Sequence, residues 1–348
     1  MSTLKDKQAA QLAERTKDKV ATQLKSKVKS AADLQHKKFE PLRWIVPEIL
    51  TEGLSMLVGK PKVGKSWLAL DIAIAVSTGG ACMGRPCEQG DVLALFLEDN
   101  ERRIQRRMTE MIGANKQDWP PRLSYVTTSD DWPRLAQGGT ELIEGWIKQA
   151  EKPRLIIVDI LERVRDRNTK SNASAYTTDY EALVALHKLA SEHQLSILVL
   201  HHQRKAGADD LMDTINGTGG IGGALDTLMV LGTDAGGHFL YGRGRDLDEF
   251  NNAVEMSKES KRWIDLGWRP EASTPERQKI VGALLKANRP VSVAEIAKAV
   301  PSMKPANVKN RLADMCKDGE VESVARGVYR LPDAQGKLDV ADSGEDVL

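Results

Sequence analysis

The sequence predicts an α/β fold in which a doubly wound, mostly parallel sheet lies between an N-terminal helical arm and a C-terminal winged helix-turn-helix. Short apolar runs alternate with helix-like stretches through the middle of the chain. The runs are 54–58, 92–97, 155–158, 196–200 and 227–231, and the helix-like stretches include 140–150 and 180–192. Continuous apolarity is typical of parallel strands that are buried on both faces. In such a sheet, ligands bind outside the carboxyl ends of the strands.

The strongest single motif is a phosphate-binding loop. Residues 59–66 read GKPKVGKS, which fits the pattern G-x-x-x-x-G-K-[ST] between an apolar strand and a helix-like stretch. Glycines let the backbone N–H groups turn toward the phosphates, the lysine brings a positive charge, and the serine hydroxyl is a ligand for Mg²⁺. The expected ligands are therefore ATP and Mg²⁺. The predicted nucleotide-binding residues are Gly59, Pro61, Val63, Gly64, Lys65, Ser66 and Trp67.

Composition excludes several other classes of protein. The net charge of +1 gives no global attraction to nucleic acid or membrane, so any such binding must come from local patches. Three cysteines, at 82, 87 and 316, cannot all pair and show no metal-site spacing, which indicates a reducing compartment. No apolar run is long enough to span a membrane, and the lysine-rich start lacks the apolar core of a signal peptide. We expect a cytoplasmic protein with no membrane partner.

Changes in composition divide the chain into four parts. Residues 1–38 carry ten Lys/Arg against four Asp/Glu and predict a helical or disordered arm. Residues 39–268 form the α/β core, 269–332 the winged helix-turn-helix, and 333–348 an acidic disordered tail. It stays open whether the arm is only solvated or contacts nucleic acid or a neighbouring subunit.

The C-terminal part follows the order helix, helix, helix, hairpin. Predicted helices at 275–287, 293–299 and 304–317 precede two short strands that turn at Gly327, and Ser292 suits the N-cap of the second helix. Lys309 and Arg311 on the third helix, with Lys304, Asn307 and Asn310, suit phosphate and base-edge contacts, and Arg326 and Arg330 would lie on the wing. Docking of a protein partner is the alternative use of such a module.

Phosphoryl transfer needs groups beyond the phosphate loop, and three strand ends supply them. Asp159 follows a buried strand, where it can support Mg²⁺. Glu98 follows another strand, beside Asp99, and can activate water as a general base. His201 and His202 end the strand 196–200, where a polar group can sense the γ-phosphate. Adjacent strand residues point to opposite faces, so the two histidines do not form a metal site.

The motifs GKPKVGKS, FLED, LIIVDI and LVLHHQRK occur in this order over residues 40–265, and the region resembles the RecA-type ATPase core. It is most similar to the branch that contains RepA-type plasmid replicative helicases and related AAA-type ATPases of phages and mobile elements. The resemblance implies that Lys65 and Ser66 hold phosphate and Mg²⁺, that Asp159 supports Mg²⁺, and that Glu98 activates water. It also places His202 at the sensor position, which is glutamine in RecA and DnaB.

RecA-type motors complete their site with a basic residue from the neighbouring subunit, which implies a homo-oligomer, expected to be hexameric. The plasmid helicases carry that arginine near the position of Leu228 or Met229 here. This departure leaves Arg243 and Arg245, an x-R-x-R pattern at a strand end, as the candidate catalytic arginines. An ordinary surface role for both is the alternative.

Two segments lie where RecA-type rings place their DNA-contacting loops. The first carries Arg163, Arg165, Arg167 and Lys170, and the second, 204–223, opens on Arg204 and Lys205 and ends in a run of glycines. Basic groups near a ring axis can follow a phosphate backbone, so single-stranded DNA is the expected partner, with replication proteins as further partners. For the first segment, a solvated basic loop without a DNA contact is the alternative. Tyr176 and Tyr180 are the only aromatic candidates for base stacking.

Three functions follow from these features. The first is an ATP-hydrolysing ring helicase or translocase that replicates a plasmid, phage or mobile element. The second is a RecA-like recombination, repair or loading ATPase. The third is a nucleotide-gated DNA-binding regulator that acts through the winged helix. Strand displacement on forked DNA would separate the first from the other two.

Overall fold

A computed structural model describes residues 28–113, 118–166, 175–202, 222–270 and 274–332. The chain forms two compact units, Met1–Leu42 and Arg43–Leu348. In the first unit, helix α2 (Ala31–Gln35) begins after Ser30, whose hydroxyl accepts the N–H of Ala32 at 3.1 Å. The rest of the predicted arm and the predicted acidic tail lie outside the described residues.

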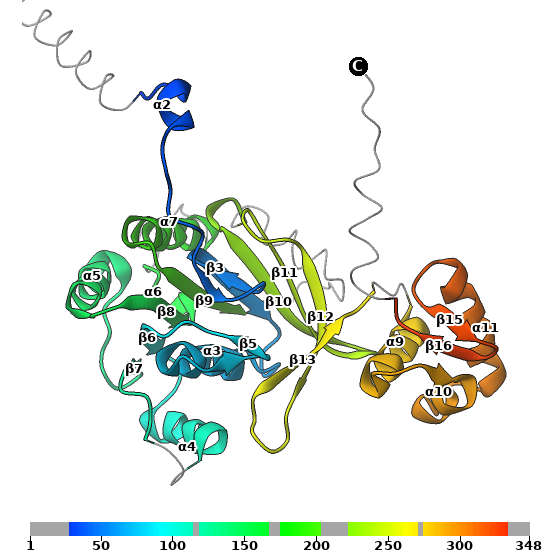
Figure 1. Ribbon diagram of the computed structural model, residues 1–348. Coiled ribbons are helices and arrows are strands. Elements are labelled where there is room, and N and C mark those ends of the chain that lie inside the picture. The colour runs from blue at the N-terminus through cyan, green and yellow to red at the C-terminus, as the bar shows by residue number, and fades with distance from the viewer. Residues whose placement is uncertain (1–27, 114–117, 167–174, 203–221, 271–273, 333–348) are drawn as a thin grey trace, which may run out of the picture. The chain divides into compact units, whose positions relative to one another are not determined.

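The second unit is built on a nine-stranded sheet in the order β7-β6-β8-β9-β3-β10-β11-β12-β13 (Figure 1). In this order the strands are Leu123–Thr127, Asp91–Phe96, Pro153–Asp159, Ser196–His202, Gly53–Gly59, Thr227–Asp234, Gly237–Gly244, Phe250–Met256 and Trp263–Trp268. The pairs from β7 to β10 are all parallel, and β11, β12 and β13 extend the sheet by antiparallel pairing. The five apolar runs are all parallel strands, so the sheet is mostly parallel as predicted and fits a RecA-like α/β fold.

Helices cover both faces of the parallel part of the sheet. Apolar side chains of α3 (Lys65–Thr78) and α4 (Glu101–Ile112) pack into one core on one face. Those of α5 (Gly139–Gln149), α6 (Leu161–Val164) and α7 (Ala175–His193) pack into a second core on the other face. Two hairpins, β1 (Trp44–Val46) with β2 (Leu50–Thr51) and β4 (Ala81–Cys82) with β5 (Arg85–Pro86), add to the first core.

Residues 274–332 form a third apolar core with three helices and a small sheet. The elements are α9 (Pro275–Ala287), β14 (Val291–Ser292), α10 (Val293–Ala299), α11 (Pro305–Lys317), β15 (Glu322–Ala325) and β16 (Val328–Arg330). Helix α10 begins with a capping box in which Ser292 and Glu295 each accept the other's backbone N–H, so the predicted cap is confirmed. Naming this region a winged helix-turn-helix, and a separate domain, stays a prediction.

This region packs closely on the edge of the large sheet. A Cβ on Gly282 of α9 would lie 2.2 Å from the carbonyl oxygen of Gly236, in the turn between β10 and β11, so only glycine allows this approach. Ala253 of β12 and Leu266 of β13 belong to the same apolar core as α9. The antiparallel strands therefore have one side that faces the C-terminal helices.

Candidate active site

The phosphate loop leaves β3 at Gly59 and enters helix α3 at Lys65. Gly64, the N-cap, has a left-handed backbone with φ of 109°, and no side chain caps this end of the helix. The first N–H groups of a helix have no partner inside the helix, and the helix dipole favours an anion there. The loop residues predicted from the motif therefore form an anion-binding helix N-terminus at the carboxyl edge of the sheet.

Two motif glycines are required by packing. A Cβ on Gly59 would lie 2.4 Å from the carbonyl oxygen of Leu231 in the neighbouring strand β10. A Cβ on Gly64 would lie 2.6 Å from Cζ2 of Trp263, at the start of β13. Both approaches are shorter than real Cβ contacts, so the loop fits the sheet only when these positions carry no side chain.

Lys65 lies beneath the loop and is 4% exposed. Its ammonium donates to the carbonyl oxygens of Gly59 at 2.9 Å and Lys60 at 3.2 Å, and lies 3.1 Å from Nδ1 of His202. Burial lowers the pKa of Lys65 to about 8, against the opposing effect of the carboxylates of Asp159 and Glu98. The lysine remains mostly charged at neutral pH and is held where loop-bound phosphates would lie.

Asp159 ends strand β8 and is 3% exposed. Burial raises the pKa of its carboxyl to about 6; a hydrogen bond with Ser66 opposes the shift, and nearby Asp99 and Glu98 add to it. A hydroxyl beside a carboxylate is an oxygen donor set that suits Mg²⁺, which keeps most of its waters and takes few protein ligands. Ser66 and Asp159 thus fit the metal role predicted for them.

His202 connects the phosphate loop to Glu98. The parallel register sets His202, the last residue of β9, opposite Gly59, the last residue of β3. Nε2 of His202 lies 3.4 Å from Oε2 of Glu98, which follows β6, and both side chains are partly exposed. Because an ammonium only donates, the lysine sets Nδ1 as the acceptor and places the ring proton on Nε2, toward Glu98.

Asp99, the other acid after β6, is held by arginines of helix α4. Its carboxylate accepts from Arg103 at 2.7 Å and from Arg107, and it is 4% exposed. The guanidinium of Arg107 also lies 5.5 Å from the ring centre of Trp67, the residue after the loop serine. Asp99 is thereby engaged, whereas Glu98 is free to contact solvent, which supports Glu98 as the base.

The two candidate catalytic arginines lie away from their own phosphate loop. Arg243 of β11 is exposed and pairs with Leu228, which in turn lies level with Met56, three residues before Gly59. Arg245 donates to the carbonyl oxygen of Gly223 at 2.9 Å and lies 3.5 Å from Asp226. Leu228 and Met229 are both buried in the sheet.

The predicted DNA-contacting residues are only partly described. Arg163 is exposed, whereas Arg165 donates to Asp179 at 2.7 Å and is mostly buried. Lys309 is exposed on α11, and Arg311 lines a groove there with Lys304, Asn307 and Asn310. Arg167, Lys170, Tyr176, Arg204 and Lys205 lie outside the residues whose side chains are described.

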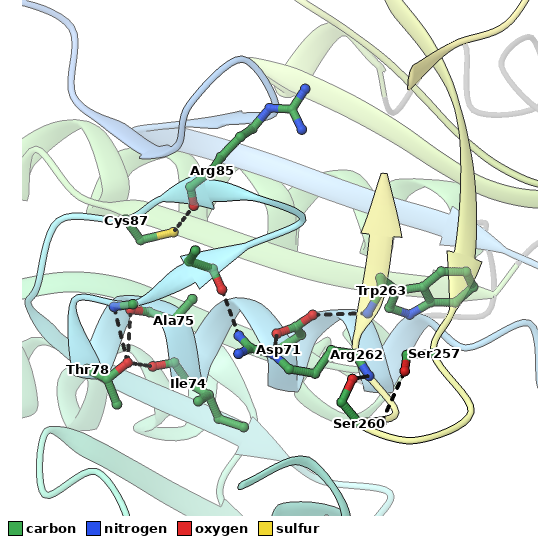
Figure 2. A network of polar contacts seen from close by, with 12 residues as sticks. Asp71, Ile74, Ala75, Thr78, Arg85, Cys87, Ser257, Ser260, Arg262 and Trp263 are labelled. Atoms are coloured by element: carbon green, nitrogen blue, oxygen red, sulfur yellow. Dashed lines mark hydrogen bonds and ion pairs between the residues drawn. The ribbon is translucent and has the colours of Figure 1, made fainter. Parts of the chain in front are cut away.

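Sequence reasoning missed a buried polar contact behind the phosphate loop. Asp71 of α3 is fully buried, and its carboxylate accepts from Nε of Arg262 at 2.6 Å and from the backbone N–H of Trp263 at 3.2 Å (Figure 2). Burial raises the pKa of Asp71, and Arg262 opposes that shift. The available signal was one acid inside the apolar helix that follows the loop.

A protein family matches the part of the chain that contains the phosphate loop. The AAA_25 family, described as an AAA domain, matches residues 21–208. No curated protein matches the sequence. No helix in the described part of the chain is long and apolar enough to cross a membrane.

Two solved structures are similar to the chain. The KaiC-like protein PH0186 of the hyperthermophilic archaeon Pyrococcus horikoshii OT3 is 13% identical, with a TM-score of 0.44 over 65% of this chain and 99% of that one. A DnaB-like replicative helicase, solved with its primase interactions, is 15% identical, with a TM-score of 0.45. That second match covers 61% of this chain and 57% of the helicase chain.

Proposed function

This chain belongs to the AAA_25 family of AAA domains, which match more than half of it, and on that premise we propose that it is an ATP-driven DNA motor. The P-loop ATPase chemistry follows from the family and the site. The proposal adds a hexameric ring that moves on single-stranded DNA as a helicase or translocase during replication of a plasmid, phage or mobile element.

The observation that carries the proposal is the chain of contacts Lys65–His202–Glu98 across three strand ends. Lys65 would hold the β- and γ-phosphates, and Glu98 would take the proton of the attacking water. His202 touches both groups, so a change at the γ-phosphate reaches the end of β9. The residues after β9 begin the segment 204–223, through which we expect DNA to be held.

Ser66 and Asp159 would hold Mg²⁺, which would neutralise charge on the phosphate oxygens when bound. Ser66 lies in the first turn of α3, directly after Lys65, and Asp159 lies at the end of β8. Ser66 and Asp159 would hold the metal against the phosphates, while Glu98, which follows β6, would act on the attacking water. This arrangement supports hydrolysis at the strand ends rather than simple nucleotide storage.

The hydrolysis step needs a cation to stabilise the negative charge that develops in the transition state of phosphoryl transfer. Within the described residues, the basic groups of the loop itself are Lys60, Lys62 and Lys65, and the nearby Arg107 forms an ion pair with Asp99. We propose that Arg243, which is exposed on β11 and lies away from its own phosphate loop, completes the site of a neighbouring subunit. This requirement calls for a homo-oligomer, which we propose to be a hexameric ring.

An ATPase assay with and without single-stranded DNA tests the proposal. A motor should show Mg²⁺-dependent hydrolysis that rises several-fold with single-stranded DNA and unwinding of forked DNA. The Lys65→Ala variant is the matched control, because it should lose hydrolysis under both conditions. Hydrolysis without any response to single-stranded DNA would contradict the motor, and a DNA response without strand displacement would make it a translocase rather than a helicase.

The groove on α11 supports a second function. Its lining includes Lys304, Asn307, Asn310 and Arg311 together with the acids Glu276 and Asp314, and Lys309 is exposed on the same helix. The basic and amide side chains among these residues fit the major groove of duplex DNA. A nucleotide-gated regulator would bind a specific duplex through this helix and would show no strand displacement, so the same assays separate the two functions.

A further inference from the structure

The hairpin of β12 and β13 lies against helix α3 through an ion pair whose carboxylate, that of Asp71, is buried. Arg262 joins two elements: Nε donates to Oδ1 of Asp71 at 2.6 Å, and Nη2 donates to the carbonyl oxygen of Ala81 at 2.7 Å (Figure 2). The backbone N–H of Trp263 donates to the other oxygen of Asp71 at 3.2 Å. One buried carboxylate on α3 therefore fixes the position of two consecutive hairpin residues.

The second of these residues packs on the phosphate loop itself. Trp263 is 3% exposed, and its ring lies so close to Gly64 that a Cβ there would be 2.6 Å from Cζ2. The methyl group of Met256, on the other strand of the hairpin, would lie 3.3 Å from the same Cβ. His238 meets the Trp263 ring edge-on, at 5.5 Å between centroids, which holds the indole from another strand.

Gly64 precedes Lys65 and has a left-handed backbone, so its geometry sets the direction of the first N–H groups of α3. A loop with a left-handed glycine is intrinsically mobile, because glycine has the widest choice of backbone angles. An aromatic ring packed on that glycine excludes other backbone conformations of the loop. The ring can do so only if the hairpin is fixed on α3, which the Asp71–Arg262 pair provides.

We propose that Arg262 and Trp263 are positioning residues that hold the phosphate loop in its nucleotide-binding shape, Arg262 through Asp71 and Trp263 through Gly64. This inference rests on the proposed nucleotide-binding function. It extends the site to the hairpin 256–263, which lies outside the family match to residues 21–208. Neither residue touches the reacting atoms.

A second ion pair on the same strand provides a matched control. Arg85 donates to Asp265 of β13 at 2.7 Å and so joins β13 to the β4–β5 hairpin. Asp265 also accepts from Asn252 of β12 at 2.8 Å. The Arg85→Ala change removes this contact from the same hairpin, two residues from Trp263, along with the contacts of Arg85 to Glu48 and to the carbonyl oxygen of Met83. It leaves the residues Asp71, Arg262 and Trp263 unchanged.

The test measures binding of a fluorescent ADP analogue with Mg²⁺ to the full chain, together with steady-state ATP hydrolysis. We expect Trp263→Phe and Arg262→Ala to raise the dissociation constant about tenfold, since a loosened loop is competent for only a fraction of the time. KM for ATP should rise more than kcat falls, because the reacting groups are unchanged. Arg262→Lys, which can still reach Asp71, should recover part of the loss, and Arg85→Ala should bind like wild type.

Trp263→Phe keeps the test valid if Arg262→Ala fails to fold. Arg262→Ala leaves the buried Asp71 carboxylate without its cation and can destabilise the fold, whereas Trp263→Phe keeps that ion pair and shortens only the ring. Wild-type affinity in folded Trp263→Phe and Arg262→Ala proteins, or an equal loss in Arg85→Ala, would overturn the positioning role. A wild-type chain that binds no nucleotide would instead overturn the proposed function itself.

Discussion

Nδ1 of His202 lies 3.1 Å from the ammonium of Lys65, so the lysine that would hold the γ-phosphate contacts the strand end that would sense it. The opposite ring nitrogen faces Glu98 at 3.4 Å. A phosphate oxygen that draws the ammonium away from Nδ1 alters both contacts together. The imidazole thus lies between Lys65 and Glu98, and we propose that it connects the nucleotide state to the general base and to the residues that follow β9.

This bridge predicts a difference between two His202 variants. His202→Gln should keep most ATPase activity, because a carboxamide can accept from Lys65 and donate to Glu98 at the same time. His202→Ala removes both contacts and should lower kcat by at least about 10²-fold, the lower end of the cost of removing one donor that stabilises a transition state. Steady-state ATPase rates of the two purified variants decide the point. Equal rates would mean that the bridge plays no part in turnover.

Substitutions of Glu98, the proposed base, and of Lys65, the proposed phosphate-binding cation, should have different effects on nucleotide binding and on turnover. Glu98→Gln should bind nucleotide normally but turn over about 10²–10⁴-fold more slowly, since a carboxamide cannot accept the proton of water. Lys65→Ala should lose nucleotide binding as well. Asp99→Asn is the control, because Asp99 forms ion pairs with Arg103 and Arg107 and we expect its role to be structural. This variant should unfold at a lower temperature than the wild type but keep most of its kcat. Near-normal turnover by Glu98→Gln would assign the base to another group.

The pKa values of the free site predict a bell-shaped dependence of kcat/KM on pH. The pKa of Asp159 is raised to about 6, so its carboxylate, and with it Mg²⁺ support, is lost as pH falls through 6. The pKa of Lys65 is lowered to about 8, so its positive charge is lost as pH rises above 8. Because kcat/KM reports the free enzyme, its two limbs should lie near these values. A flat profile from pH 5 to 9 would contradict both assignments.

The sequence predicted the parallel strands, and the acids and the histidine at three of their ends, because each is a local pattern. Apolar runs ended at Glu98, Asp159 and His202, and parallel strands bring such ends to one edge of the sheet. The antiparallel strands β12 and β13 were missed, since Phe250–Met256 mixes apolar, amide and acidic residues without a clear period. The Asp71–Arg262 pair joins positions 191 residues apart and leaves no local signal beyond a single acid in an apolar helix.

Arg243 and Arg245 should differ in a subunit-mixing experiment. Arg245 is held by Gly223 and Asp226 of its own chain, whereas Arg243 is exposed on β11. Arg243→Ala and Lys65→Ala proteins, each inactive alone, should recover part of the ATPase activity when mixed, because some interfaces then pair an intact loop with an intact arginine. Mixing Arg243→Ala with itself at the same total concentration is the control. No recovery, together with a monomeric mass in ATP and DNA, would exclude a catalytic arginine in trans.

The last prediction concerns where DNA couples to hydrolysis. A chain of net charge +1 must bind DNA through local basic patches, and the segment that opens with Arg204 and Lys205 begins two residues after His202. If the protein is a motor, Arg204→Ala/Lys205→Ala should abolish most of the stimulation of ATPase by single-stranded DNA and leave the basal rate intact. Each lost phosphate contact should also reduce the slope of log affinity against log salt by about one unit.

The matched variant alters the other basic surface, on α11. Lys304→Ala/Lys309→Ala should weaken DNA binding but keep the stimulation, because α11 belongs to the third apolar core and does not adjoin the strand ends that carry Asp159 and His202. Point variants suit this test better than truncation, since removing α9 would expose Ala253 and Leu266 on the sheet edge. Stimulation that survives the Arg204/Lys205 change but vanishes with the α11 change would replace the motor with a nucleotide-gated regulator, because DNA would then act through α11.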